Sequence, residues 1–428
     1  MFIEFKVKNF RSISDWQSFS MLAEKKVSER ESTIVKKSDL NILPTAIIYG
    51  RNASGKSNLL TAFNALQYIV MESADLKVDE KIAPYEPFKL NEKGQNEPVE
   101  FSIDFIAKDN IRYVYSVGFL DNEITYENLK FYPKSQPAVL FDRKSGKKIK
   151  YGEYLLGKKK EIEDLLYPNQ LFLSKVGTEK NEQLKEVYRF FAEHLFTSTS
   201  HDTRFDETLI RFFSEKLGKN NIPHFYENIS KLMRVADTGI EEITIKEEEI
   251  DKSVLPKEMS DEEKQKISER YKYKIRTIHK KFNNDSDESG KVEFKLSEES
   301  TGTIKLLAMG GLILEALAAG QVLIIDELDK SLHPKLTRAL INIFQCKKNN
   351  PYNAQLIFAT HDVSLLDPEL FRRDQVWFAE KEFEGNSHYY SISDIQGIRA
   401  NIPFEKYYMT GRFGGTPVIN ENELNFQF

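Results

Sequence analysis

The chain has 428 residues, enough for one large or two ordinary domains with a substantial hydrophobic core. Its net charge of −5 gives no general attraction to nucleic acid, so contact with DNA or RNA would need a local basic patch. The only cysteine, Cys346, excludes a disulfide within the chain and a zinc site built from cysteines, and we expect a cytoplasmic protein.

The first ten residues are typical of a half-buried strand. Ile3, Phe5 and Val7 alternate with charged residues, unlike the apolar segment of a signal peptide. The longest apolar run, residues 306–325, is interrupted by Glu315 and by glycines. We interpret it as a buried helix followed by a strand, and we expect no membrane partner.

A phosphate-binding loop follows the next strand. Residues 45–50 are a short apolar strand, and residues 58–70 repeat apolar side chains at helical spacing. Between them, GRNASGKS fits the pattern G-x-x-x-x-G-K-[ST], in which backbone N–H groups bind phosphate. Lys56 is expected at the β- and γ-phosphates and Ser57 at Mg²⁺. A glycine-rich turn with a chance lysine is the alternative, which the strand–loop–helix context disfavours. The predicted nucleotide-binding residues are Gly50, Arg51, Asn52, Ala53, Ser54, Gly55, Lys56, Ser57 and Asn58.

Three further segments, residues 99–106, 113–120 and 124–132, alternate apolar and polar side chains. This period of two predicts an antiparallel sheet layered beside the nucleotide-binding sheet.

From about residue 155 the spacing of apolar residues becomes helical, so residues 155–290 are predicted to form a helical insertion. Its most polar stretch, residues 246–291, is interpreted as an exposed helical arm or a partly disordered loop. The basic run within it, residues 270–281, is either a solvated charged face or a contact for nucleic acid. The predicted head combines residues 1–154 and 291–428.

Two acidic residues follow an apolar strand late in the chain. Residues 322–325 end in Asp326 and Glu327, which we expect to hold the Mg²⁺ shell and to polarise the attacking water, respectively. To share one Mg²⁺ with the loop, this strand is expected to lie beside the strand ending at Gly50. Alternatively, such acids cap a helix. A second strand ends in His361, which either hydrogen-bonds the γ-phosphate or is structural.

These motifs, together with FKVKNFRSI near the start and ELDKSLHP after the acids, resemble the ATPase heads of the ABC superfamily, in the SMC, RecF and OLD branch. The resemblance implies an α/β head with a mixed sheet and an antiparallel side layer. It also implies a composite ATP site, in which the phosphate loop of one head faces a signature motif of a second. Ser300 and Gly302 match the serine and second glycine of L-S-G-G-Q, whereas Thr301 and Thr303 depart from it. The alternative for Ser300 is an ordinary helix cap.

Two more residues receive roles from the resemblance. Asp329 corresponds to the aspartate that contacts the partner head, so Asp329 and Ser300 are the predicted interface residues. Gln170 is the candidate for the glutamine that couples the lobes at the nucleotide; an exposed loop glutamine is the alternative.

Residues 297–303 and the tail at 407–419 are similar to the stand-alone ATPases of bacterial anti-phage systems, of the RloA and abortive-infection type. This implies a sensor or scaffold that hydrolyses ATP with Mg²⁺ and assembles as a homodimer or higher oligomer. Its separately encoded effector would be a Toprim-like or other nuclease, and a phage product would be the trigger. The roughly sixty residues after Asp362 are too few for a fused nuclease domain.

Two other functions compete with this interpretation. One is a RecF- or SMC-like repair ATPase that clamps duplex DNA, for which nucleic acid is the partner. The other is a conventional P-loop kinase or GTPase. The latter leaves Asp326, Glu327 and His361 unexplained, and the chain lacks the N-K-x-D guanine motif.

Overall fold

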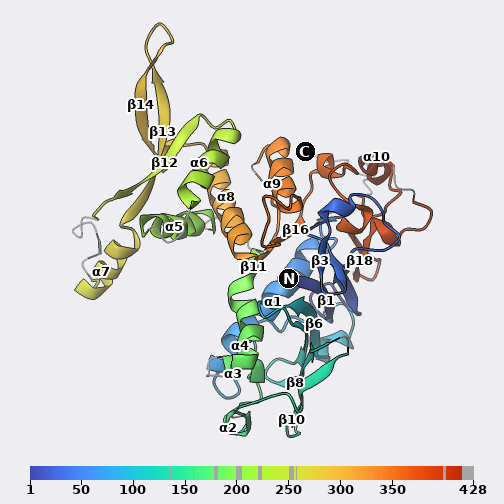
Figure 1. Ribbon diagram of the computed structural model, residues 1–428. Coiled ribbons are helices and arrows are strands. Elements are labelled where there is room, and N and C mark those ends of the chain that lie inside the picture. Colours follow the sequence, from blue (N-terminus) through green and yellow to red (C-terminus); the bar gives the residue numbers. More distant parts are fainter. Residues whose placement is uncertain are drawn as a thin grey trace, which may run out of the picture. The chain divides into compact units, whose positions relative to one another are not determined.

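The computed structural model in Figure 1 describes residues 1–134, 136–157, 159–177, 182–198, 205–219, 224–249, 255–256, 258–330, 332–398 and 402–416. The chain divides into two compact units. The first contains residues 1–199, 319–328 and 341–428, and the second contains residues 200–318 and 329–340.

The first unit has a six-stranded central sheet. Its strands follow the order β11-β15-β16-β5-β17-β18, and each pair is parallel except β17 with β18. Their apolar residues are buried on both faces, as expected for parallel strands. The bounds are β11 Leu195–Ser198, β15 Val322–Ile325, β16 Gln355–Ala359, β5 Thr45–Tyr49, β17 Val376–Lys381 and β18 Ser387–Ser391.

A seven-stranded antiparallel sheet forms a second layer, as the period-two segments predict. Its order is β10-β9-β8-β7-β6-β1-β2, with a separate two-stranded ribbon of β3 and β4. The bounds are β1 Phe2–Lys8, β2 Gln17–Ser20, β3 Val35–Lys37, β4 Leu40–Ile42, β6 Val99–Ile106, β7 Arg112–Phe119, β8 Ile124–Tyr132, β9 Ala138–Lys144 and β10 Lys150–Tyr151.

Helix α1, Lys56–Glu72, joins the two sheets through one hydrophobic core. The Phe63 ring of α1 lies 4.1 Å from the Phe5 ring of β1, between ring centroids, and 5.2 Å from that of Phe2. The same core contains Ile48 of β5 and Ile357 of β16. The helix that follows the phosphate loop is therefore fixed by packing against both layers.

The remaining helices of the first unit are short: α2 Lys159–Glu163, α3 Phe172–Gly177, α4 Glu182–Arg189 and α10 Phe404–Met409. Helix α9, Pro334–Gln345, has residues in both units. Strand β11 lies inside the predicted insertion, yet it pairs with β15 in the central sheet. The head fold therefore extends to about residue 198, beyond the predicted boundary at residue 154.

The second unit combines helices with a three-stranded antiparallel sheet, where the sequence predicts a helical insertion. Its strands are β12 Ile240–Glu247, β13 Tyr273–Phe282 and β14 Glu288–Lys295, and β13 lies in the middle. Its helices are α5 Phe205–Gly218, α6 Phe225–Val235, α7 Asp261–Arg270 and most of α8 Thr301–Ala319. Figure 1 shows the β13–β14 hairpin running beyond the end of β12.

The prediction of a helical or disordered arm at residues 246–291 is wrong for β13 and for residues 288–291, the part of β14 that lies within this range. The β-branched residues Ile275 and Thr277 are buried and lie two apart, which favours a strand, and the Arg276 between them is also buried and is paired with Glu248. The high charge of this stretch obscured that pattern in the sequence.

The apolar run at 306–325 is a helix followed by a strand, as predicted. Helix α8 is long and apolar enough in composition to cross a membrane, but 56% of its most apolar window is buried within the protein. Such burial is typical of a core helix.

Candidate functional site

The phosphate-binding loop connects the end of β5 to the start of α1. Gly50, Ala53 and Gly55 have φ angles of 153°, 61° and 108°, in the range that favours glycine. A Cβ atom built on Gly50 would lie 2.4 Å from the carbonyl oxygen of Ala379 in β17. The first glycine of the motif is therefore required by close packing as well as by backbone conformation.

The predicted nucleotide-binding residues occupy different depths in this loop. Asn52 and Ala53 are exposed at its tip, whereas Arg51 is half-buried and donates from Nη2 to the Lys381 carbonyl, at 2.9 Å. Ser57 and Asn58 are half-buried in the first turn of α1. The exposed tip leaves one side of the loop open for a ligand.

Lys56 is buried within the loop. Its Nζ donates to the carbonyl oxygens of Gly50, at 2.7 Å, and Arg51, at 3.3 Å. Burial lowers the pKa of Lys56 to about 8, while the nearby carboxylates of Asp326 and Glu327 raise it. The fold thus brings the lysine and both predicted acids into one electrostatic environment, although more than two hundred residues separate them in sequence.

The two acids lie where β15 ends. The Asp326 N–H donates to the Ser198 carbonyl of β11, at 2.9 Å, and the Glu327 N–H donates to the Ala359 carbonyl of β16, at 3.1 Å. Glu327 has a φ of 55°, which is uncommon for a residue with a side chain. Neighbouring strands therefore hold the backbone of both acids, and Glu327 adopts a conformation often found at functional sites.

The prediction that β15 lies directly beside β5 in the sheet is wrong. Strand β16 lies between them, pairing Ile325 with Phe358 on one side and Ala359 with Ile48 on the other. Because all three strands are parallel, their carboxyl ends meet at one sheet edge. The middle strand brings His361 to the edge that also carries the loop and the acids.

One oxygen of Asp326, Oδ2, is buried and accepts no hydrogen bond from any residue that the structure describes. A buried, uncompensated carboxylate oxygen fits a residue that acts on a cation. Within the described ranges, no group of three or more His, Cys, Asp and Glu side chains has the arrangement of a metal site. This donor set fits Mg²⁺, which is usually held by one or two protein ligands, water and substrate phosphates.

His361 follows β16 and is exposed. The backbone on each side of it is fixed: the Thr360 N–H donates to the Ile48 carbonyl at 3.2 Å, and Tyr49 Oη donates to the Asp362 carbonyl at 2.9 Å. An imidazole on a rigid backbone at this edge can act on a bound ligand.

Gln170 is not the exposed loop residue that formed the alternative in sequence. It is buried, and its Nε2 donates to the carbonyls of Ala74 and Leu76, each at 2.9 Å. Its Oε1 accepts from the Tyr167 N–H at 3.2 Å. These bonds fix the turn after α1, so the amide already has a structural role; its predicted contact with nucleotide stays a prediction.

The remaining predicted residues belong to the second unit. Ser300 is exposed and caps α8: its Oγ accepts from the Thr303 N–H at 3.1 Å and lies 2.8 Å from Thr303 Oγ1. Gly302 is half-buried in the first turn of the helix, and the half-buried Asp329 follows the acidic pair. Within a single chain, Ser300 therefore acts as a helix cap, which is the alternative that the sequence left open. A cap at an exposed helix N-terminus leaves neighbouring N–H groups for an anion, so it is compatible with the predicted signature role.

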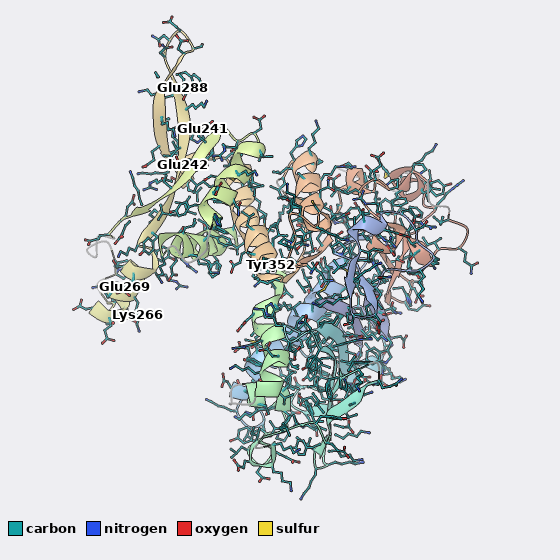
Figure 2. The ribbon with its side chains drawn as sticks, viewed as in Figure 1. Glu241, Glu242, Lys266, Glu269, Glu288 and Tyr352 are labelled. Atoms are coloured by element: carbon teal, nitrogen blue, oxygen red, sulfur yellow. The ribbon has the colours of Figure 1, made fainter. Side chains whose placement is uncertain are left out.

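Three of the six lysines and arginines in the basic run of the second unit, residues 270–281, are paired with acids. Lys272 and Arg276 contact Glu247 and Glu248, respectively, and Lys280 lies 3.0 Å from Glu288. Figure 2 shows glutamates on the same small sheet, with Glu241 and Glu242 on β12 and Glu288 near the end of the hairpin. This pairing reduces the positive potential that a nucleic-acid backbone would need.

A family model matches residues 46–367, which is more than half of the chain. The family is described as an AAA domain, putative AbiEii toxin of a type IV toxin–antitoxin system. This chain belongs to that family. The matched segment of this AbiEii-type AAA domain begins in β5 and includes the phosphate loop, both acids and His361.

No curated protein matches this AbiEii-type AAA domain, whereas several solved structures are similar. An SMC head bound to the C-terminal winged-helix domain of ScpA is 13% identical, covering 91% of this chain and 97% of the other, with a TM-score of 0.43. The SMC head of Thermotoga maritima is 12% identical, with coverages of 91% and 98% and a TM-score of 0.39. The recombination mediator RecF with ATP is 14% identical, with coverages of 91% and 97% and a TM-score of 0.36.

The predicted fold class is confirmed. This AbiEii-type AAA domain has an α/β fold, with a mixed central sheet and an antiparallel side layer. Family membership also establishes the type of ligand, because this is a family of nucleotide-binding P-loop ATPases.

Three residues that contact the phosphate loop were missed in the sequence. Ser387 and Tyr389 of β18 hydrogen-bond the carbonyls of Ser54 and Gly55, and Ser12 bonds both Ser387 and Asn58. The sequence of residues 387–391, SHYYS, indicates at most a strand, and nothing in it indicates a contact with the phosphate loop.

Proposed function

We propose that this chain binds ATP with Mg²⁺ and hydrolyses it, and that nucleotide controls its assembly in a bacterial anti-phage system. The observation that carries the proposal is the meeting of Lys56, Asp326 and Glu327 at the carboxyl ends of parallel strands. A lysine buried in a phosphate loop and paired electrostatically with two acids has the composition of a phosphoryl-transfer site.

Each residue then has a chemical task. The loop amides and Lys56 hold the β- and γ-phosphates, while Ser57 and Asp326 would hold Mg²⁺, which neutralises phosphate charge when bound. Glu327 orients and deprotonates the attacking water, and its position beside β16 keeps the carboxylate at the sheet edge. His361, on the same edge, donates a hydrogen bond to the γ-phosphate.

The active unit is at least a homodimer. Ser300 and Gly302 begin a helix whose N-terminus is exposed, and an exposed N-terminus favours a phosphate from another molecule. Each chain carries one loop and one such helix, so a two-fold pair would complete two sites. Asp329 would contact the partner at this interface, and nucleotide would hold the two chains together.

At the cellular level, the chain acts as a sensor or scaffold that controls a separately encoded effector, a Toprim-like or other nuclease, after a phage product triggers it. The family description, which names a putative AbiEii toxin of a type IV toxin–antitoxin system, supports a role in phage defence. Nucleotide would shift the chain between assembled and dissociated states, and the effector would respond to that shift.

The first test is biochemical: ATP binding and phosphate release by the purified wild-type chain, with and without Mg²⁺. ATP binding with Mg²⁺-dependent release is expected, and a chain that binds no nucleotide would refute the proposal. The second is a plaque assay in cells that express the chain with its neighbouring reading frame. We expect the wild-type chain to protect the cells and the Lys56→Ala variant to give no protection. Unchanged protection by that variant would show that defence does not require ATP binding.

A DNA-clamping function is the alternative from the sequence. The pairing of Lys272, Arg276 and Lys280 with glutamates gives it little support. Duplex binding by the wild-type chain that falls steeply with salt would nevertheless favour the clamp over the scaffold.

A further inference from the structure

The outer side of the phosphate loop is bound by a strand from the far end of the sequence. Ser387 Oγ donates to the Ser54 carbonyl at 2.8 Å, and Tyr389 Oη donates to the Gly55 carbonyl at 2.7 Å. Residues 387 and 389 lie two apart on β18, so both side chains point to the same face of the strand. One face of β18 therefore holds two successive carbonyls of the loop.

The N-terminal loop extends this set of contacts. Ser12 Oγ lies 2.8 Å from Ser387 Oγ and accepts from Asn58 Nδ2 at 2.7 Å. The Ser387 N–H also donates to the Ser12 carbonyl, at 2.7 Å. Two hydroxyls, one from each end of the chain, thus connect the loop carbonyl of Ser54 to the first turn of α1.

The contact is also sterically tight. A Cβ atom on Gly55 would lie 2.4 Å from Ser387 Oγ and 2.9 Å from Tyr389 Oη. The second glycine of the motif is therefore required because β18 presses against the loop. Tyr389 is buried and its pKa is raised by burial, so its hydroxyl keeps the proton that it donates.

These contacts matter for phosphate binding because of peptide geometry. Successive N–H groups of a phosphate loop must point at the anion, which turns the attached carbonyls outward. The Ser54 carbonyl accepts from Ser387 Oγ, and the Gly55 carbonyl accepts from Tyr389 Oη as well as from the Asn58 and Leu59 N–H groups, at 3.0 and 3.1 Å. A carbonyl that lost one of these donors would be less restrained, and the attached amide would be less restrained with it. Donors on the outer side therefore hold the inner amides in place before the ligand arrives, which lowers the cost of ordering them on binding.

We propose that Ser387 and Tyr389 are positioning residues for the phosphate loop, which fix its amides in the orientation that binds the phosphates of a nucleotide. The proposal rests on the proposed function, since it assigns a role within that same site. Neither residue touches the ligand. A purely structural role, in which the two hydroxyls only satisfy buried carbonyls, would affect stability without affecting nucleotide affinity.

The neighbouring residue Tyr390 provides a matched control. It lies on the opposite face of β18, where its Oη donates to the Phe413 carbonyl at 2.8 Å and lies 2.9 Å from Glu380 Oε2. Tyr390→Phe and Tyr389→Phe each remove one hydroxyl from the same strand, and each leaves one carbonyl without that donor. Of these two carbonyls, only that of Gly55, the acceptor of Tyr389, belongs to the phosphate loop.

The experiment compares the full-length wild type, Tyr389→Phe, Ser387→Ala and Tyr390→Phe by melting temperature, Kd for ATP and steady-state kinetics. One lost hydrogen bond typically contributes a factor of about five to ten, so Tyr389→Phe and Ser387→Ala should raise Kd and KM by that factor. We expect kcat to change by less than about twofold, because Glu327 is unaffected. Tyr390→Phe should leave Kd and KM unchanged.

Wild-type affinity in both Tyr389→Phe and Ser387→Ala, with melting temperatures lowered as in Tyr390→Phe, would overturn the inference. If one of these two variants fails to fold, the other decides the outcome. A wild-type chain that binds no ATP would instead refute the proposed function, so the two failures are distinguishable.

Discussion

The Glu327 N–H donates to the Ala359 carbonyl at 3.1 Å, which fixes the proposed catalytic acid to the strand that separates it from the phosphate loop. Ala359 in turn pairs with Ile48, two residues before Gly50. The backbone hydrogen bonds between β15 and β16, and between β16 and β5, thus set the position of Glu327 relative to the phosphate loop. Glu327 also has a φ of 55°, so its side chain leaves the strand end in a direction that a regular extended residue would not give.

Lys56→Ala should abolish ATP binding. Lys56 is the buried cation of the loop, and the nearby Asp326 and Glu327 would leave the pocket net negative without it. Calorimetric titration of the variant with ATP and Mg²⁺ is expected to give no heat of binding. Lys89→Ala, which removes an exposed lysine, serves as the control and should bind as the wild type does.

Glu327→Gln should retain ATP but nearly stop turnover. Glutamine keeps the shape of the side chain and loses the base, and removing a general base typically slows a reaction by ~10²–10⁴. Single-turnover phosphate release, measured beside ATP affinity, separates the two effects. Wild-type turnover in this variant would show that another group activates water.

The stability of the nucleotide-free protein should rise with pH between about 8 and 10.5. Burial lowers the pKa of Lys56 from 10.5 to about 8, so over this range the unfolded chain binds more protons than the folded chain. The charged lysine therefore destabilises the fold below pH 8, by on the order of 3 kcal/mol, and this cost disappears by about pH 10.5.

The matched variant for this effect is Lys56→Met, which keeps an unbranched side chain without charge. Denaturant unfolding at several pH values should show the free energy of unfolding of the wild type rising, relative to that of Lys56→Met, between pH 8 and pH 10.5. A difference that stays constant over this range would mean that Lys56 is not desolvated.

Mixing Lys56→Ala chains with Ser300→Arg chains should partly restore ATP hydrolysis, although each variant alone is inactive. In the mixed dimer one composite site carries both changes and the other carries neither. Phosphate release by mixtures that contain heterodimers, verified with two affinity tags, measures this. No recovery in such a mixture would indicate that each chain hydrolyses ATP alone.

The elements of the site could be predicted from the sequence because each has a local pattern. The motif around Lys56, the apolar strand before Asp326 and the strand before His361 are all where the sequence indicates. The order of the strands could not be predicted, because hydrophobic periodicity shows that a strand is buried without showing which strand lies beside it. The insertion of β16 between β15 and β5 is therefore a result of the structure alone.

Other features depend on contacts between distant segments. Strand β11 has only four residues, and its place beside β15 follows from pairing across more than a hundred residues. In the hairpin of β13, the frequent charges concealed the alternation that defines the strand. Ser387 and Tyr389 acquire their importance from contact with a loop more than three hundred residues earlier in the chain.

The strand order also sets the timing of maturation on the ribosome. Strand β5 emerges early, yet both of its lateral partners, β16 and β17, are translated about three hundred residues later. At a translation rate of ~5–20 residues per second, roughly 15–60 s pass between the synthesis of β5 and that of its neighbouring strands. The antiparallel layer and α1 can pack in the meantime, because most of their partners are encoded nearby. A chain released before β16 is translated would contain the entire phosphate-loop sequence but lack the sheet that shapes it, so we expect such a chain to bind no nucleotide.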